Sequence, residues 1–262
     1  MDNPLVSVII PTKNSSRTLE RCLESIKKQS YKNIELIIVD NNSTDNTKEI
    51  AKKYTDKVFN LGPERSTQRN FGAKQAKGEY LLIHDSDIFF NINSIKECVE
   101  LSEWKRCDAV ILPEKSIGVG FWAKVKAFER SFYVGNDYME GIRFFRKDKF
   151  LLIGGYDENL YAGEDWDLTI RFREKDYKIS RIISFIEHDE GDINLFGSSQ
   201  KKKYYGSNFF EIYAKKHPVE FKKQMSFFYR FSFIKIIKKG LRHPVLFGCM
   251  ISMKIIEYIN SK

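Results

Sequence analysis

Three groups of acidic residues in this chain could do chemistry. Asp85-Ser86-Asp87 follows one apolar run, Asp40 ends another, and Glu164-Asp165 opens a helical pattern. Carboxylate oxygens on a short turn suit Mg²⁺ or Mn²⁺, which usually keep their other positions for water and phosphate oxygens. A further carboxylate could accept a proton from a reacting hydroxyl. The same residue types are common in solvated turns and at helix N-termini, so local sequence leaves both interpretations open.

The elements that must position these side chains follow a β-α-β-α-β order. Apolar, β-branched runs predict buried strands, and helical periodicity predicts the helices between them. These are strand 5–10, helix 17–29, strand 34–39, a helix from 43 or 44 to about 54, strand 57–60, helix 66–77 and strand 80–84. Further along we expect helices at 94–104, 121–134 and 164–175, and strands at 109–112, 141–145 and 179–183. The pattern predicts an α/β fold with a mostly parallel sheet, in which ligands bind beyond the carboxyl ends of the strands.

Several common nucleotide and hydrolase motifs are absent from the sequence. The first strand is followed by Pro11-Thr12-Lys13-Asn14-Ser15 rather than G-x-G-x-x-G, which disfavours a Rossmann dinucleotide site. Neither the P-loop motif G-x-x-x-x-G-K-[ST] nor the nucleophile elbow G-x-S-x-G occurs. A P-loop ATPase or GTPase is therefore excluded.

A set of motifs in order resembles the family-two glycosyltransferases. The matching segments are 8–14, 37–47, 68–72, 76–80, 85–87, 154–158 and 163–168 with Arg171. The resemblance covers about residues 5–190, and the order and spacing of several motifs make it more specific than any one of them. It implies a GT-A fold, which is Rossmann-like, and a metal-dependent, inverting hexosyltransferase that uses a nucleotide-diphospho-sugar.

The resemblance also assigns donor-binding roles. Asp40 would bind the nucleotide base, with Pro11 and Asn14 lining the same pocket. Arg69 would lie near the diphosphate, and Asp85 would touch the ribose or the sugar. The neighbours of Asn14 and the residue after Asp40 depart from the family pattern, which leaves the base open between UDP- and GDP-linked donors.

Catalysis and metal binding are assigned to the remaining acidic residues. Asp87 of the Asp-x-Asp (DXD) motif would hold Mn²⁺ or Mg²⁺, and His188, after the last core strand, is a candidate second ligand or a structural histidine. Asp165, beside Glu164, would be the general base. The alternative is that Glu164 and Asp165 only favour a helix N-terminus by their charge.

A second diphosphate contact is suggested further along the chain. Gln200-Lys201-Lys202-Lys203-Tyr204-Tyr205 loosely resembles the Q-x-x-R-W motif of processive, membrane-bound relatives. Lys203 with Tyr204 or Tyr205 would help to clamp the diphosphate. The alternative is a solvated basic face.

The net charge of +9 is concentrated in the last quarter of the chain. Residues 1–199 hold 30 Lys+Arg and 32 Asp+Glu, whereas residues 200–262 hold 14 and 3. We expect residues 200–262 to form basic amphipathic helices at an anionic membrane surface. Two apolar stripes are expected, each on one helix: Phe227, Phe231 and Ile234 beside Lys235, Lys238 and Lys239, and Leu246, Met250, Met253 and Ile256. The alternative is that the stripes pack on the core.

The cysteine spacing and the search for targeting segments constrain where the protein is located and what it binds. The four cysteines have no C-x-x-C spacing, so neither a zinc site nor a disulfide framework is expected. We expect no signal peptide, no transmembrane helix and no nucleic-acid partner. The sequence thus predicts a peripheral or monotopic enzyme on the cytoplasmic face of a membrane, with a lipid-linked acceptor.

The predicted organisation is a GT-A catalytic domain at 1–199 and a basic aromatic helical tail at 200–262. Two alternatives come from other classes. A nucleotidyltransferase shares the sheet and the carboxylates but leaves the block from Gly154 to Arg171 unexplained. A non-catalytic sugar-nucleotide or membrane-binding module is the other.

Overall fold

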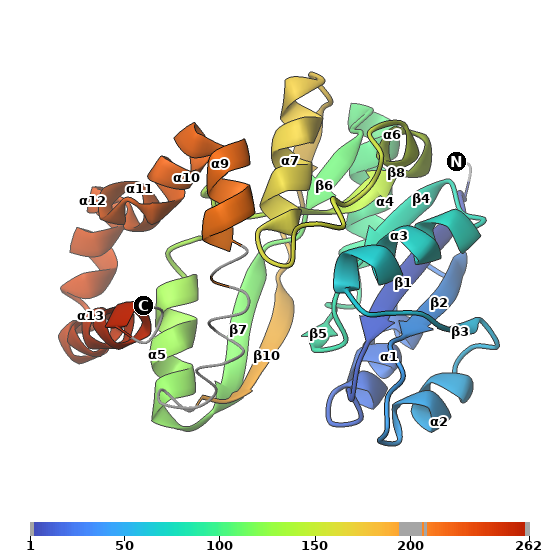
Figure 1. Ribbon diagram of the computed structural model, residues 1–262, viewed down its shortest axis with the longest axis horizontal. Coiled ribbons are helices and arrows are strands. Elements are labelled where there is room, and N and C mark those ends of the chain that lie inside the picture. The colour runs from blue at the N-terminus through green and yellow to red at the C-terminus, as the bar shows by residue number, and fades with distance from the viewer. Residues whose placement is uncertain (1–2, 194–205, 207–208, 260–262) are drawn as a thin grey trace. The chain divides into compact units, whose positions relative to one another are not determined.

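The computed structural model of the protein describes residues 3–193, 206 and 209–259, in two compact units (Figure 1). Unit 1 comprises Met1–Pro113, Gly141–Glu158 and Glu164–Glu187. Unit 2 comprises Glu114–Glu140, Asn159–Gly163 and His188–Lys262.

Unit 1 is built on a seven-stranded, mostly parallel sheet. Its strands are β1 (Val6–Thr12), β2 (Ile34–Asp40), β3 (Val58–Asn60), β4 (Tyr80–Ile83), β6 (Ala109–Ile111), β8 (Ile142–Arg146) and β9 (Ile179–Arg181). Their order is β3-β2-β1-β4-β8-β6-β9. Only β8 runs antiparallel to its neighbours. The predicted α/β class with a mostly parallel sheet is confirmed.

Helices connect these strands and cover the sheet. They are α1 (Leu19–Lys27), α2 (Thr47–Lys52), α3 (Arg65–Gln75), α4 (Ser94–Lys105), α6 (Lys147–Leu152) and α7 (Glu164–Glu174), with a short strand β5 (Ile88–Phe89) after β4. Ile9, Val39, Leu81, Phe145 and Leu168 belong to one buried cluster of the core. Helix α3 approaches β1 closely at Gly72, where a Cβ would lie 2.4 Å from Ile9 Cγ2. This packing fixes the helix that carries Arg69.

The sheet register brings the predicted carboxylates to one edge. Strands β1 and β2 are parallel, with Thr12 opposite Asp40 at their carboxyl ends. Strand β4 is parallel to β1 and ends at Ile83, so Asp85 and Asp87 follow at the same edge. This edge is where open α/β sheets bind ligands.

Unit 2 contains β7 (Glu114–Val119), paired with β10 (Ile186–Asp192), and a set of helices. The helices are α5 (Gly120–Arg130), η1 (Phe209–Tyr213), α9 (Ala214–Lys216), α10 (Pro218–Met225), α11 (Phe227–Phe231), α12 (Phe233–Lys235), η2 (Ile236–Gly240) and α13 (Pro244–Ile259). No helix among the described residues is long and apolar enough to cross a membrane. All four cysteines are free thiols.

One expectation for the basic C-terminal segment is wrong. Phe227 and Lys239 do not share one helix, because Ser232 adopts a φ of +55° and separates α11 from α12. The second stripe does lie on one helix, α13. Its Met250 and Met253 are fully buried, which agrees with packing on the core, whereas Leu246 and Ile256 are half-buried.

Candidate active site

Asp40 is buried at the carboxyl end of β2, surrounded by donors of the chain itself. Thr12 Oγ1 donates to Asp40 Oδ1 over 2.9 Å. Ser43 donates twice, from its N–H to Oδ2 over 2.8 Å and from its Oγ to Oδ1 over 2.5 Å. A carboxylate offers about four acceptor sites. Lys48 Nζ lies 3.7 Å from Asp40 Oδ2, so groups of the chain itself surround both carboxylate oxygens.

Pro11 and Asn14 lie on the same sheet edge as Asp40. Pro11 is buried within β1, whereas Asn14 is exposed with a left-handed φ of +49°, which asparagine tolerates. The Asn14 N–H donates to Ser43 Oγ over 2.8 Å, and its Oδ1 accepts from the Thr44 N–H over 2.9 Å. The structure thus brings these three predicted residues together, and Asn14 ties the β1–α1 loop to the β2–α2 loop.

Arg69 is the centre of a buried ion cluster, which we call the Arg69 cluster. Its side chain is only 1% exposed. Nη2 lies 2.7 Å from Asp85 Oδ1, and Nη1 lies 3.1 Å from Glu164 Oε1 and 3.2 Å from Asp165 Oδ1. The Arg69 guanidinium therefore joins Asp85 to the pair Glu164 and Asp165, which come from two of the three acidic segments that the sequence singled out.

Two further arginines border the Arg69 cluster, and both were missed by the sequence analysis. Arg65 lies one turn before Arg69 on α3, with its guanidinium 3.6 Å from Asp85 and 3.5 Å from Glu164. Arg143 on β8 lies 3.9 Å from Asp165. The spacing of Arg65 and Arg69 at i and i+4 was a readable signal, because such residues share a helix face. Arg143 gave none, since its partner is on another element.

The charges in the Arg69 cluster shift its carboxyl groups in opposite directions. Burial opposes ionisation of Asp85, but Arg69 and Arg65 outweigh it and hold the pKa of that carboxyl well below its usual range. Burial and the neighbouring carboxylate of Asp165 raise the pKa of Glu164. Neighbouring carboxyl groups that are pushed apart in this way are typical of acid–base sites.

Asp165 is the more open member of the acidic pair. Its side chain is 25% exposed, against 7% for Glu164. It lies in the first turn of α7, where the helix N-terminus favours a negative charge. A Cβ on Gly141 would lie 3.0 Å from the Asp165 Cβ, so a larger residue there would crowd it.

The Asp85-Ser86-Asp87 turn provides hard oxygen donors that fit a divalent ion. Both aspartates are half-buried, and Ser86 Oγ donates to Ser15 Oγ over 2.9 Å, which ties this turn to the β1–α1 loop. Within the described part of the chain, no three His, Cys, Asp or Glu side chains form a ready-made metal cluster. Mg²⁺ sites of one or two carboxylates completed by substrate phosphates need no such cluster.

The other predicted ligand, His188, lies on β10 in unit 2. Its Nδ1 is 3.2 Å from Oε2 of Glu114 on β7. Lys203 and Tyr204, the predicted diphosphate clamp, lie outside the described residues, as does Tyr205.

Some residues of the block from Gly154 to Arg171 have a structural role. Gly154 and Gly155 both have positive φ, +87° and +68°. Arg171 donates to the carbonyls of Ile153 and Gly155 over 3.0 and 2.6 Å, and to Asp167 Oδ2 over 2.8 Å. Arg171 therefore holds the glycine turn against α7, which begins with Glu164 and Asp165.

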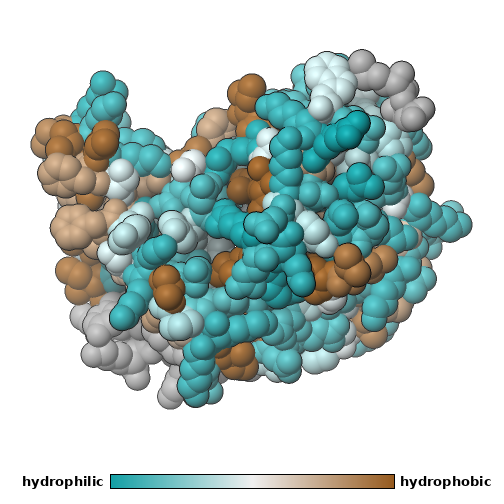
Figure 2. All heavy atoms as spheres, turned by 90° about the horizontal axis from the view of Figure 1, so that it is seen from above, coloured by the Kyte–Doolittle hydropathy of each residue, from teal (hydrophilic) through white to brown (hydrophobic). Residues whose placement is uncertain are grey.

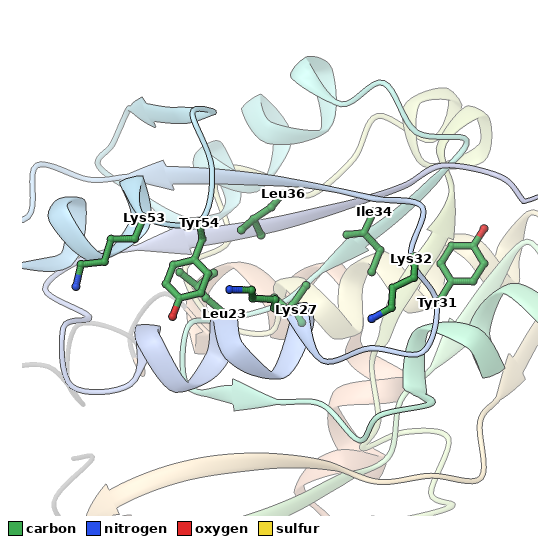
Figure 3. Close-up of a pocket in the computed structure, with 9 residues that line it drawn as sticks. Leu23, Lys27, Tyr31, Lys32, Ile34, Leu36, Lys53 and Tyr54 are labelled. Carbon is green, nitrogen blue, oxygen red and sulfur yellow. The ribbon is translucent and has the colours of Figure 1, made fainter.

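A separate pocket in unit 1 contains none of the predicted site residues (Figure 3). It has a volume of about 280 Å³ and is lined by residues of α1, of the loop between α1 and β2, of β2 and of the turn after α2. Figure 3 shows Lys27 beside Tyr54, and the Lys27 Nζ lies 5.8 Å from the centre of that ring. The lining consists of aliphatic, tyrosine and lysine side chains, with no carboxylate for catalysis.

Comparison with known proteins identifies the family of this chain. Residues 7–157 match the sequence model of the family described as glycosyl transferase family 2. The chain belongs to glycosyltransferase family 2. It is 39% identical over 114 residues to the glycosyltransferase GlyG of Streptococcus pneumoniae, covering 41% of this chain and 38% of GlyG. It is 30% identical over 188 residues to an uncharacterised glycosyltransferase of Rickettsia typhi, covering 65% of this chain and 59% of that protein.

Solved structures show the same GT-A fold at low sequence identity. Residues 1–349 of TarS from Staphylococcus aureus, in complex with UDP-GlcNAc, align with a TM-score of 0.61 at 20% identity, over 95% of this chain and 72% of that one. The mannosyltransferase PcManGT of Pyrobaculum calidifontis, in complex with GDP-Man and Mn²⁺, aligns with a TM-score of 0.60 at 16% identity, over 95% and 74%. The predicted family and the predicted fold are both confirmed.

Proposed function

We propose that this family-two protein is a metal-dependent, inverting glycosyltransferase that moves a hexose from a nucleotide-diphospho-sugar to an acceptor. One observation carries the proposal: Asp85, Glu164 and Asp165, from two separate segments, converge on Arg69 at the carboxyl edge of a GT-A sheet. A nucleotidyltransferase would not require the acidic pair on α7. A silent binding module would not require two adjacent carboxylates and a third from another segment around one buried arginine.

In this proposal Asp165 is the general base. Because the pKa of Glu164 is raised, Glu164 takes up a proton more readily than an ordinary glutamate. Asp165 is the more exposed member of the pair, 25% against 7%, so an attacking hydroxyl reaches it more easily. A single displacement by that hydroxyl inverts the anomeric carbon. If the acceptor is a lipid phosphate that is already ionised, Asp165 orients it instead.

The donor end is assigned to the two loops that follow β1 and β2 and to the turn after β4. Asp40, Pro11 and Asn14 would hold the base, and Asp85 the ribose or the sugar. Asp87 would hold Mn²⁺ or Mg²⁺, which when bound offsets the negative charge on the leaving diphosphate. His188, in unit 2, stays a candidate ligand on the sequence pattern alone. Lys203 and Tyr204 remain proposed as a second diphosphate contact.

Arg69 has a different role in this proposal from the one the resemblance implies. A guanidinium that is 1% exposed and engaged with three carboxylates has little surface left for a diphosphate. We assign it as a positioning residue that fixes Asp165 relative to Asp85. Arg65, whose side chain is 45% exposed, is the cation of the Arg69 cluster that solvent and ligands reach more easily.

The donor base, the acceptor and the location are proposed more broadly. Structures with this fold hold UDP-GlcNAc in one case and GDP-Man in another, so both UDP- and GDP-linked donors are candidates. A lipid-linked acceptor and a peripheral position at the cytoplasmic face of a membrane fit the basic C-terminal segment. The catalytic domain at 1–199 and the tail at 200–262 stay proposals, because their boundary falls within the undescribed residues.

A donor screen tests the proposal. The purified chain is melted with UDP, GDP and other nucleoside diphosphates, with and without Mn²⁺, and release of nucleoside diphosphate from the matching sugar donor is then measured. We expect one nucleotide to raise Tm more than the others, in a Mn²⁺-dependent manner, and the same donor to be turned over. Stabilisation without turnover for any donor or acceptor would favour the silent module.

A further inference from the structure

The segment 227–245 of unit 2 has an inner face that packs within the unit and an outer face that is exposed. It contains Arg230, Lys235, Lys238, Lys239 and Arg242 and no Asp or Glu. A segment of this composition has no internal acid to neutralise its cations. The structure shows which cations are used inside the protein and which face outward.

The inner face of the segment is fastened to the turn that directly follows α5. Lys235 Nζ donates to the carbonyls of Phe132 and Val134 over 2.9 and 2.6 Å, and Lys239 Nζ donates to the carbonyl of Ser131 over 2.7 Å. Cations at a helix C-terminus are favourable because they satisfy its free carbonyls. Phe231 is buried, edge-on against Phe132 at 5.6 Å.

Lys235 and Lys239 therefore do not belong to the outward basic face on which the sequence pattern placed them. Because they are held by backbone carbonyls, their charge is directed into unit 2. Their neighbours Ile234, Ile237 and Lys238 are exposed, whereas Ile236 is half-buried.

The outer face carries large apolar side chains that no part of the described chain covers. Their exposed fractions lie between 44 and 77%. They are Phe228, Phe233, Ile234, Ile237, Leu241 and Val245. Lys238 and Arg242, also exposed, lie among them. Figure 2 shows hydrophobic side chains at the surface of this region (left edge).

We propose that this outer face lies flat on an anionic bilayer, with Phe228, Phe233 and Ile234 at the boundary of the acyl chains. Lys238 and Arg242 contact the lipid headgroups. The inference deepens the proposed membrane location by naming the contact face, and it rests on that location rather than on catalysis.

The charge of the face decides between possible occupants. An apolar patch of this kind marks an interaction site. A second copy of the same face would bring Lys238 and Arg242 toward their own counterparts without any acid to pair with them. An anionic headgroup layer neutralises them, at roughly 1 kcal/mol for each basic residue. The arrangement also matches that of interfacial helices, whose apolar side sinks into the headgroup region.

The test is co-sedimentation of the full chain with vesicles, which does not depend on turnover. Vesicles of phosphatidylcholine mixed with phosphatidylserine are compared with vesicles of phosphatidylcholine alone. We expect wild type to bind the mixed vesicles more tightly. The triple variant Phe228→Ser, Phe233→Ser, Ile234→Ser should bind at least about tenfold more weakly, since it removes three of the apolar side chains that the bilayer would bury.

Two further variants separate the contributions. Lys238→Gln with Arg242→Gln should lower binding to the mixed vesicles only, by about tenfold. The matched control Leu152→Ser with Ile183→Ser, which removes two exposed apolar side chains of unit 1, should bind as wild type does.

Three results would overturn the inference. They are no binding of wild type to the mixed vesicles, equal binding by the triple variant, and a wild-type dimer in solution that the triple variant abolishes. Turnover of a soluble donor is measured in parallel with the same variants. If turnover is intact and vesicle binding is absent, only this inference fails. If vesicle binding is intact and turnover is absent, the proposed transferase activity fails instead.

Discussion

The protein holds two buried ion clusters that are built from similar parts but differ in their openness. In unit 2, Glu129 of α5 lies 2.9 Å from Lys126 Nζ and 2.5 Å from Lys254 Nζ of α13, and it accepts from the hydroxyl of Tyr133. We call this the Glu129 cluster. Its carboxylate is fully buried and its cations are in excess. In the Arg69 cluster of unit 1, Glu164 is also buried, but the side chains of Asp85 and Asp165 are 23% and 25% exposed.

The two clusters shift the pKa of a buried glutamate in opposite directions. Burial opposes ionisation in both. At Glu129 the two lysines outweigh burial and hold the pKa well below its usual range. At Glu164 the adjacent carboxylate of Asp165 adds to burial, and the pKa is raised. A closed cluster with excess cations fastens a helix, whereas an open one with adjacent carboxylates suits proton transfer.

The largest expected effect is on the metal side of unit 1. Asp87→Asn preserves shape but removes a hard anionic ligand, so we expect nucleoside diphosphate release to fall by about 100-fold or more. Chelation with EDTA should have the same effect on wild type, with restoration by Mn²⁺. Tm without donor should not change in either case. Full activity in EDTA would remove the metal from the proposal.

Arg69→Lys tests the positioning role. Lysine carries a point charge instead of a planar fork, so it cannot hold carboxylates from two segments at once. We expect turnover to fall roughly 10- to 100-fold through misplacement of Asp165, with the donor KM nearly unchanged. The surface variant Arg146→Lys is the control. A raised donor KM with intact turnover would instead return Arg69 to the diphosphate.

Glu129→Gln should affect stability and leave catalysis intact. It leaves Lys254 and Lys126 without their buried counter-charge, so the free energy of unfolding should fall by about 3 kcal/mol. Chemical denaturation measures this change. The control is Glu100→Gln, which removes the charge of an exposed glutamate. We expect its free energy of unfolding to stay within about 0.5 kcal/mol of the wild-type value. Equal stability of the two variants would show that the Glu129 cluster is not an anchor.

The smallest effect is on the pH dependence of stability. Because the folded pKa of Glu164 is raised, the folded protein keeps a proton that the unfolded chain loses, and stability falls as pH rises between the two values. Glu164→Gln removes this contribution. Its Tm should therefore fall less than that of wild type from about pH 5 to about pH 8. Parallel Tm curves would show that Glu164 is not perturbed.

The sequence predicted the elements of unit 1 well and its contacts only in part. Strands such as 34–39 and 80–84 were visible because β-branched, buried runs are a local signal. The meeting of Arg69 with Asp165 was not, because 96 residues separate them and only the sheet order brings them together. Arg143 was missed for the same reason.

Unit 2 was harder to predict from its sequence. Strand β7, Glu114–Val119, carries little apolar alternation, and β10 is mostly acidic, so neither gave a strand signal. The break at Ser232 depends on a backbone conformation that serine rarely adopts. The side chains of Lys235 and Lys239 point inward because they donate to backbone carbonyls just after α5, more than a hundred residues earlier in the chain.

The comparison of the two clusters is tested most directly by measuring nucleoside diphosphate release for Asp165→Asn and Glu129→Gln side by side, below the Tm of both. Removal of a general base lowers turnover by about 100- to 10,000-fold. The account predicts such a loss for Asp165→Asn, with its Tm close to that of wild type, and near-normal turnover for Glu129→Gln. Wild-type turnover in Asp165→Asn would contradict the assignment of the Arg69 cluster as the catalytic centre.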